Sequence, residues 1–72
     1  MLEDGTYDAV VVDAEEADGD AIALDLAILA GPHKGELVRI TGPIPGRDPL
    51  DLLAIPATIT VADGEPAVVL ED

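Results

Sequence analysis

Residues 6 to 29, TYDAVVVDAEEADGDAIALDLAIL, decide the fold of this chain. The pattern of residues 6 to 16 is alternating and rich in β-branched side chains, which predicts a strand. Its alternation places Tyr7, Ala9 and Val11 on one face. The other face then carries Asp8, Val10, Val12 and Ala14.

A tight hairpin is expected next, because Asp18-Gly19-Asp20 places a glycine, which tolerates positive φ, between two alternating runs. Residues 21 to 29 are predicted to form a second strand whose inner face carries Ile22, Leu24, Leu26 and Ile28. Ala and Leu also favour helices, but the strict alternation favours the strand. The opposite face is small or polar except for Leu29, which predicts a sheet with one side in water.

A glycine-bracketed loop, Gly31-Pro32-His33-Lys34-Gly35, leads into a predicted third strand over residues 36 to 41. In this strand Val38 and Ile40 face inward, and Leu37 and Arg39 face outward. Residues 42 to 49, GPIPGRDP, carry three prolines and two glycines, so we expect an irregular connection there.

A short helix is predicted after this connection. Asp48 is the expected N-cap and Pro49 the first helical residue, where a missing N–H costs nothing. Pro56 disfavours helical angles at the residue before it, so the helix must be short. Its apolar residues, Leu50, Leu53 and Ala54, are expected to plug one end of the sheet.

The last part of the chain predicts a second hairpin. Residues 57 to 62 form the expected fourth strand, with Ile59 and Val61 facing inward. Asp63-Gly64 is a two-residue turn signal, and residues 65 to 70 form the fifth strand. Pro66 suits a sheet edge or a strand end, where no ladder hydrogen bond is lost.

This order of elements predicts an all-β fold, a small five-stranded OB-like barrel with one helical turn between the third and fourth strands. An SH3-like barrel is the alternative, although its short helical turn normally lies between the fourth and fifth strands. Residues 1 to 72 are long enough for one small domain. No repeat or linker divides them.

Composition limits the location and chemistry of the protein. Hydrophobic residues make up 49% of the chain, which predicts a packed domain rather than an acidic tail. The absence of Cys excludes disulfides, thiolate metal sites and Cys nucleophiles. No apolar run reaches membrane-spanning length, and the acidic start, Met1-Leu2-Glu3-Asp4, differs from a basic secretion signal. We therefore expect a cytoplasmic protein without a membrane segment.

Charge is distributed unevenly along the chain, whose net charge is -13. All Lys and Arg, and the only His, lie between His33 and Arg47, where Glu36 is the only acid; the other 15 of the 16 acids lie elsewhere. Such a charge repels phosphate backbones, and Tyr7 as the only aromatic gives no stacking platform for bases. Nucleic acid is therefore a disfavoured ligand.

The candidate binding residues are His33, Lys34, Arg39 and Arg47. Backbone amides and a cation in a glycine-bracketed loop can hold an anion, and the two arginines would extend this cationic surface if they folded toward the loop. Alternatively, the glycines are turn residues, His33 and Lys34 are solvated, and the arginines pair with nearby acids. The acidic first hairpin lacks the spacing of an EF-hand and is interpreted as a solvated turn. No cofactor or metal site is predicted.

Two segments resemble a known family. Residues 28 to 38, ILAGPHKGELV, and residues 5 to 14 are similar to the strand-loop-strand piece and the first strand of small OB-like proteins of phage recombination and replication clusters. The resemblance implies single-strand binding. The segment GPHKG is also similar to the KOW motif of ribosome-associated and transcription-associated barrels, and the chain resembles small acidic proteins of high-GC bacteria.

The sequence favours a non-catalytic binding module over an enzyme, because no activated nucleophile or cofactor loop is recognisable. The expected partner is another protein, or a second copy of this chain held head-to-tail through the surface of residues 33 to 47. One alternative is an acidic nucleic-acid mimic that occupies a partner's binding site. Another is an OB-fold single-strand-binding protein.

The crowding of carboxylates generates a first prediction. Because like charges repel in the compact state, added salt or mild acidification should raise the melting temperature until specifically paired acids become protonated. Thermal unfolding followed by circular dichroism across a salt series measures this effect. A melting temperature that falls between low and moderate salt would contradict it.

Overall fold

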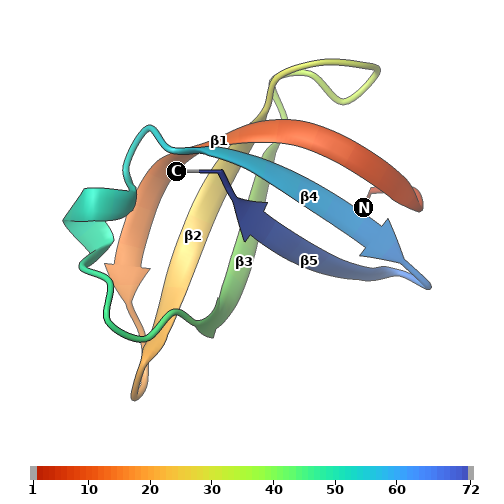
Figure 1. The fold of residues 1–72 in the computed structure, drawn as a ribbon. Coiled ribbons are helices and arrows are strands. Elements are labelled where there is room, and N and C mark those ends of the chain that lie inside the picture. Colours follow the sequence, from red (N-terminus) through yellow and green to blue (C-terminus); the bar gives the residue numbers. More distant parts are fainter. Residues whose placement is uncertain (1, 72) are drawn as a thin grey trace.

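A computed structural model describes residues 2 to 71 of the chain. It contains strands β1 (Gly5–Glu16), β2 (Ala21–Ile28), β3 (Leu37–Pro43), β4 (Pro56–Ala62) and β5 (Glu65–Leu70) and the 3-10 turn η1 (Pro49–Leu52). The strands form one antiparallel sheet in the order β3-β2-β1-β4-β5, which curls into a half-barrel (Figure 1). The fold is therefore all-β and OB-like, with its helical turn between the third and fourth strands as predicted.

Strand β1 joins the two halves of the sheet, because it pairs with β2 on one side and with β4 on the other. Its register with β2 shifts between Val11 and Asp13, which marks a β-bulge. The predicted alternation of β1 is wrong beyond this point: Ala14 lies opposite Leu24 and packs against the core, on the same face as Ala9 and Val11. A bulge inserts one unpaired residue and bends the strand, so the inner face changes from odd to even positions.

The bulge lies beside the connection between η1 and β4. The Val11 N–H donates to the Ile55 carbonyl at 3.0 Å, and the Ala54 N–H donates to the Val11 carbonyl at 2.8 Å. Ala54 adopts a left-handed conformation with φ of 67°, which is unusual for a residue with a side chain. The chain therefore turns sharply at Ala54 to bring β4 alongside β1.

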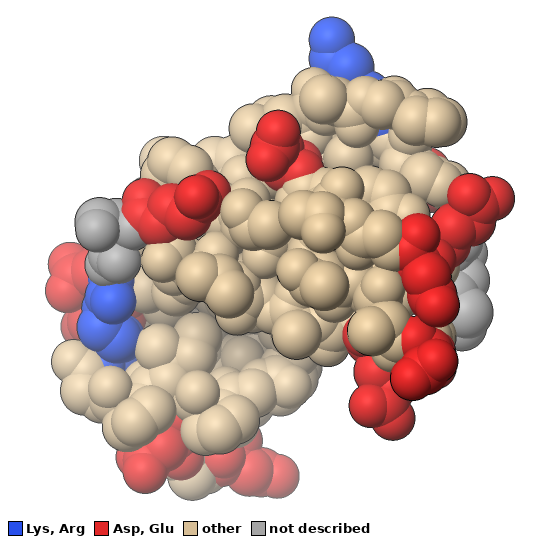
Figure 2. All heavy atoms as spheres, turned by 45° about the vertical axis from the view of Figure 1, so that its right-hand side comes forward, with Lys and Arg blue, Asp and Glu red and all other residues tan. Residues whose placement is uncertain are grey.

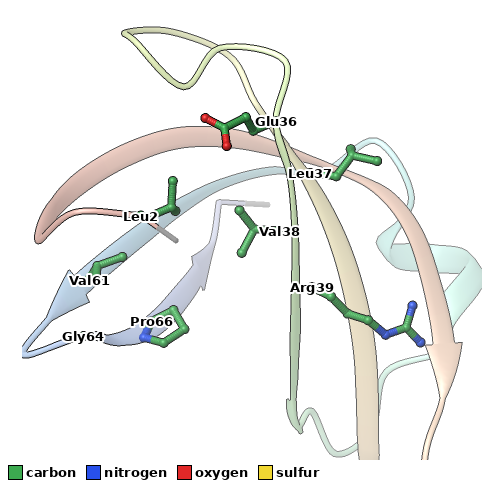
Figure 3. A pocket seen from close by; sticks show the side chains of 8 residues that line it. All are labelled: Leu2, Glu36, Leu37, Val38, Arg39, Val61, Gly64 and Pro66. Carbon is green, nitrogen blue, oxygen red and sulfur yellow. The ribbon is translucent and has the colours of Figure 1, made fainter.

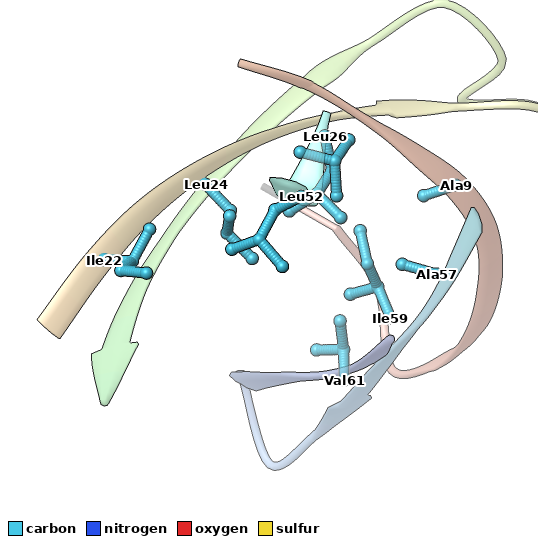
Figure 4. Close-up of a cluster of buried hydrophobic side chains, with 9 residues drawn as sticks. Ala9, Ile22, Leu24, Leu26, Leu52, Ala57, Ile59 and Val61 are labelled. Carbon is cyan, nitrogen blue, oxygen red and sulfur yellow. The ribbon is translucent and has the colours of Figure 1, made fainter. Parts of the chain in front are cut away.

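The predicted alternation of the other strands is confirmed. The core is built from β1, β2, η1 and β4, whose side chains converge inside the curl (Figure 4). Partly buried apolar residues of β3 and β5 pack against it, including Val38, Ile40, Val68 and Leu70. Its buried members are Ala9, Val11, Ile22, Leu24, Leu26, Leu52, Ala57, Ile59 and Val61.

The helical element begins as predicted, with Asp48 as N-cap accepting a hydrogen bond from the Leu50 N–H at 2.9 Å and Pro49 at the first position. The predicted plug is wrong, however. Leu52 is the buried residue, whereas Leu50 and Leu53 are 75% and 41% exposed and Ala54 is also exposed. The reason is that η1 is one turn of 3-10 helix followed by extended backbone at Leu53, and such a turn directs one apolar side chain inward.

Strand β3 is longer than predicted and continues through Gly42 and Pro43, which lie opposite Ile22 and Ala21. Proline is tolerated here because β3 is an edge strand. The second hairpin is as predicted: Asp63 and Gly64 both have positive φ, of 53° and 78°, as a two-residue hairpin turn requires.

The role of Leu52 generates a second prediction. Leu52→Ala should lower the free energy of unfolding by about 3 kcal/mol, because it leaves a cavity in a small core. Leu50→Ala, two residues away and exposed, is the matched control and should cost less than about 0.5 kcal/mol. Urea unfolding of both variants measures the difference. Equal losses would show that Leu52 does not plug the barrel.

Candidate functional site

The loop between β2 and β3 is closed by backbone hydrogen bonds. The Ile28 N–H donates to the Glu36 carbonyl at 3.0 Å, and the Gly35 N–H donates to the Ile28 carbonyl at 2.8 Å. Within the loop, the Lys34 N–H donates to the Gly31 carbonyl at 3.1 Å. The loop projects from the barrel on the side away from η1 (Figure 1) and holds Lys34 in an exposed position.

His33 is bound to the body of the protein. Its Nδ1 is hydrogen-bonded to the Glu36 carboxylate, and its ring contacts the ring of Tyr7 edge-on, with centroids 5.9 Å apart. Tyr7 in turn donates its hydroxyl proton to the Glu3 carbonyl. His33 therefore acts as a link between the loop and β1 rather than as a solvated tip residue.

Arg39 lies on the outer face of β3, directly opposite Asp25 of β2. Its guanidinium donates to both Asp25 carboxylate oxygens at 3.1 and 3.2 Å and to the Glu15 carboxylate at 3.1 Å. The hydrogen bond with Glu15 and the negative charge of Asp25 raise the pKa of Arg39. Asp13 lies opposite Asp25 on β1, so Arg39 also offsets repulsion between these two acids.

Arg47 lies in the connection between β3 and η1. It is half-buried and lines a hollow of about 180 Å³ together with Glu16 and Asp20 of the first hairpin. Strand β3 separates this connection from the loop that carries His33 and Lys34, and seven residues of strand span roughly 20 Å. The four predicted binding residues are therefore not gathered into one cationic surface.

The surface is dominated by acids. No charged or polar residue is buried among residues 2 to 71, so the carboxylates lie at the surface. Figure 2 shows Asp and Glu around the rim of one face, with Lys and Arg at two separate places and a broad uncharged area between them. A partner that approaches this protein meets a negative potential from most directions.

An apolar groove between β3 and the β4–β5 hairpin was not predicted from the sequence. It has a volume of about 330 Å³, and its apolar lining includes Leu2, Val38, Val61 and Pro66 (Figure 3). Glu36 and Arg39 also line it, and the Arg39 side chain points away from Leu2, Val61 and Pro66. Two sequence features could have pointed to this groove. One is the period-two pattern of the third strand, and the other is Pro66, because a proline on the fifth strand indicates an edge of the sheet.

The described part of the chain contains no cluster of three or more His, Asp or Glu residues arranged to hold a metal ion. None of its helical segments has the length and hydropathy needed to cross a membrane. Comparison with known protein families, curated proteins and solved structures finds no match to this chain.

The position of Arg39 among acids generates a third prediction. Arg39→Gln should lower the urea midpoint, because Glu15 and Asp25 lose the cation between them, and the loss should shrink as salt rises. Lys34→Gln is the matched control, since it removes the same charge from an exposed loop residue with no ion pair among residues 2 to 71.

The pH dependence follows from the raised pKa of Arg39. A raised folded-state pKa stabilises the fold fully below the ordinary pKa of arginine, so the difference between wild type and Arg39→Gln should persist from neutral to mildly alkaline pH. It should disappear in acid once both carboxylates are protonated. A control variant that loses as much stability as Arg39→Gln would contradict this account.

Proposed function

We propose that this chain is a non-catalytic protein-interaction module that recognises a positively charged partner. The observation that carries the proposal is the placement of the charged side chains: the carboxylates lie at the surface, and Arg39 on the outer face of the edge strand β3 is held by Glu15 and Asp25. The surface therefore favours cationic protein over anionic ligands.

The non-catalytic part of the proposal is supported by the arrangement of the reactive side chains. His33 is engaged with Glu36 and Tyr7, and the chain contains no Cys. Thr41 lies on β3 opposite Ala23, which carries no basic group. This arrangement does not resemble an activated nucleophile.

Single-strand binding, which the resemblance to phage-associated proteins implies, is the less favoured alternative. The outer face of β1, β2 and β3 carries Asp13, Glu15 and Asp25, which would repel a phosphate backbone. Tyr7, the only aromatic residue, packs against the core and His33 instead of standing on this face. The face therefore lacks a stacking platform.

A nucleic-acid mimic is the second candidate function. Asp13, Glu15 and Asp25 are held on a rigid sheet, and fixed carboxylates can take the place of phosphates in a basic binding site. In that case nucleic acid and this protein would compete for the same partner. Head-to-tail self-association stays a prediction, although the cationic surface that it needs is divided between the two ends of β3.

The fourth prediction concerns the partner. The immobilised protein should retain basic proteins from a cell lysate and release them as salt rises, because screening weakens contacts between opposite charges. A triple variant with Asp8→Asn, Glu16→Gln and Asp18→Asn changes three acids that are exposed in the wild type. It should retain a smaller amount of basic protein and release that protein at a lower salt concentration.

The proposal would be contradicted if the retained proteins had no excess of basic residues. It would also be contradicted if the amount retained did not change with salt concentration. Added duplex or single-stranded DNA separates the two candidates. Release by DNA supports the mimic, whereas retention in the presence of DNA supports an interaction module whose partner uses another surface.

A further inference from the structure

The sheet has two free edges, β3 and β5, which border one seam of the half-barrel. Each strand is antiparallel to its neighbour, so β3 and β5 run in the same direction across the seam. They approach each other but form no ladder. The groove lined by Leu2 and Val38 and a second hollow of about 420 Å³ lined by Ile40 and Val68 lie along this seam.

The hydrogen-bonding pattern shows which groups of β3 face the seam. The even residues at both ends bond toward β2: the Glu36 carbonyl accepts from the Ile28 N–H, and the Ile44 N–H donates to the Asp20 carbonyl. Backbone groups alternate in direction along an antiparallel strand. The N–H and C=O groups of Leu37, Arg39 and Thr41 therefore point to the free edge.

The same reasoning applies to β5, where the Glu71 N–H donates to the Pro56 carbonyl, so odd residues bond toward β4. Its free edge then presents Pro66, Val68 and Leu70, and proline has no N–H to offer. The β5 edge is therefore blunted at its start. The β3 edge offers three N–H donors in a row and is interrupted only at Pro43.

The surroundings of the β3 edge favour a cationic segment. The groove beside it is lined mainly by apolar residues, together with Glu36 and Arg39. The Arg39 guanidinium is bonded to Asp25 and Glu15 and points away from Leu2, Val61 and Pro66 (Figure 3). At the hairpin end, Asp4 accepts hydrogen bonds from the Asp63 and Gly64 N–H groups, both at 3.2 Å, next to the exposed Asp63 and Glu65. A groove with an apolar floor and with acids at its ends suits an extended segment in which aliphatic and basic side chains alternate.

We propose that an extended, basic segment of a partner protein adds to the free edge of β3 as a sixth strand. The Leu37, Arg39 and Thr41 backbone groups form the ladder, aliphatic side chains of the segment enter the groove beside Val38, and its Lys or Arg side chains face the acids at the groove ends. This inference rests on the proposed function, since it names the site and the shape of the basic partner.

The fifth prediction uses a defined probe, a fluorescein-labelled peptide of sequence Lys-Val-Lys-Thr-Lys-Val-Lys with blocked ends. The peptide should bind at low salt in a fluorescence-anisotropy titration, and hydrogen exchange at Leu37, Arg39 and Thr41 should slow by at least about tenfold on binding. A peptide with Glu in place of Lys, and one with the same charges but N-methylated at its three central residues, should not bind, because methylation of consecutive residues removes donors on both edges of the segment.

Matched protein variants locate the site. Val38→Thr changes the groove with little change in volume and should weaken peptide binding by about fivefold or more. Val69→Thr, at a position that is 62% exposed on β5 and outside the groove lining, should leave binding unchanged. Circular dichroism and urea unfolding check that both variants remain folded.

The outcomes separate the inference from the proposed function. Peptide binding without slower exchange at the three amides, or an equal loss with both variants, would overturn strand addition. Capture of basic proteins without peptide binding would overturn the inference and leave the proposed function standing, and failure of both experiments would remove both. Light scattering that shows a dimer broken by Val38→Thr would place a second copy on β3 and also overturn the inference.

Discussion

The fold depends on the double pairing of β1. This strand bonds to β2 along one edge and to β4 along the other, and the bulge after Val11 lets it bend between the two halves of the sheet. Both backbone groups of Val11 are used by the connection that follows η1. The same connection follows Leu52, which packs under the curled sheet. The bend of β1 and the closure of the core beside η1 therefore depend on the same segment.

The electrostatics follow from this small core. A domain of this size can bury apolar side chains but cannot offset the desolvation of many charges, and the structure buries none among residues 2 to 71. The acids therefore crowd the surface, and Arg39 lies where β1, β2 and β3 bring Asp13, Glu15 and Asp25 together. The result is a negative surface with an apolar seam between β3 and β5.

Much of the fold could be predicted because period-two alternation and turn chemistry are local properties of the chain. The inner residues of β2, the Asp63-Gly64 turn and the Asp48 cap are examples. The bulge could not be predicted, since the run Val10-Val11-Val12 suits either face and the register of β1 depends on its pairing with two other strands. Leu52 was not predicted as the buried residue for a related reason. Which side chain of a single 3-10 turn points inward depends on the strands that the turn packs against.

The candidate site was predicted as a set of cations, but the fold divides them: Arg39 joins Asp25 and Glu15, and β3 lies between His33 and Arg47. Which edges of the sheet remain unpaired is a property of the whole topology, so the seam could not be read from local pattern. Hydrogen exchange of the free protein tests most directly whether the edge of β3 is unpaired. The amides of Leu37, Arg39 and Thr41 should exchange much faster than those of Val38 and Ile40. Equal protection at all five positions would show that β3 pairs with β5 and that the barrel is closed.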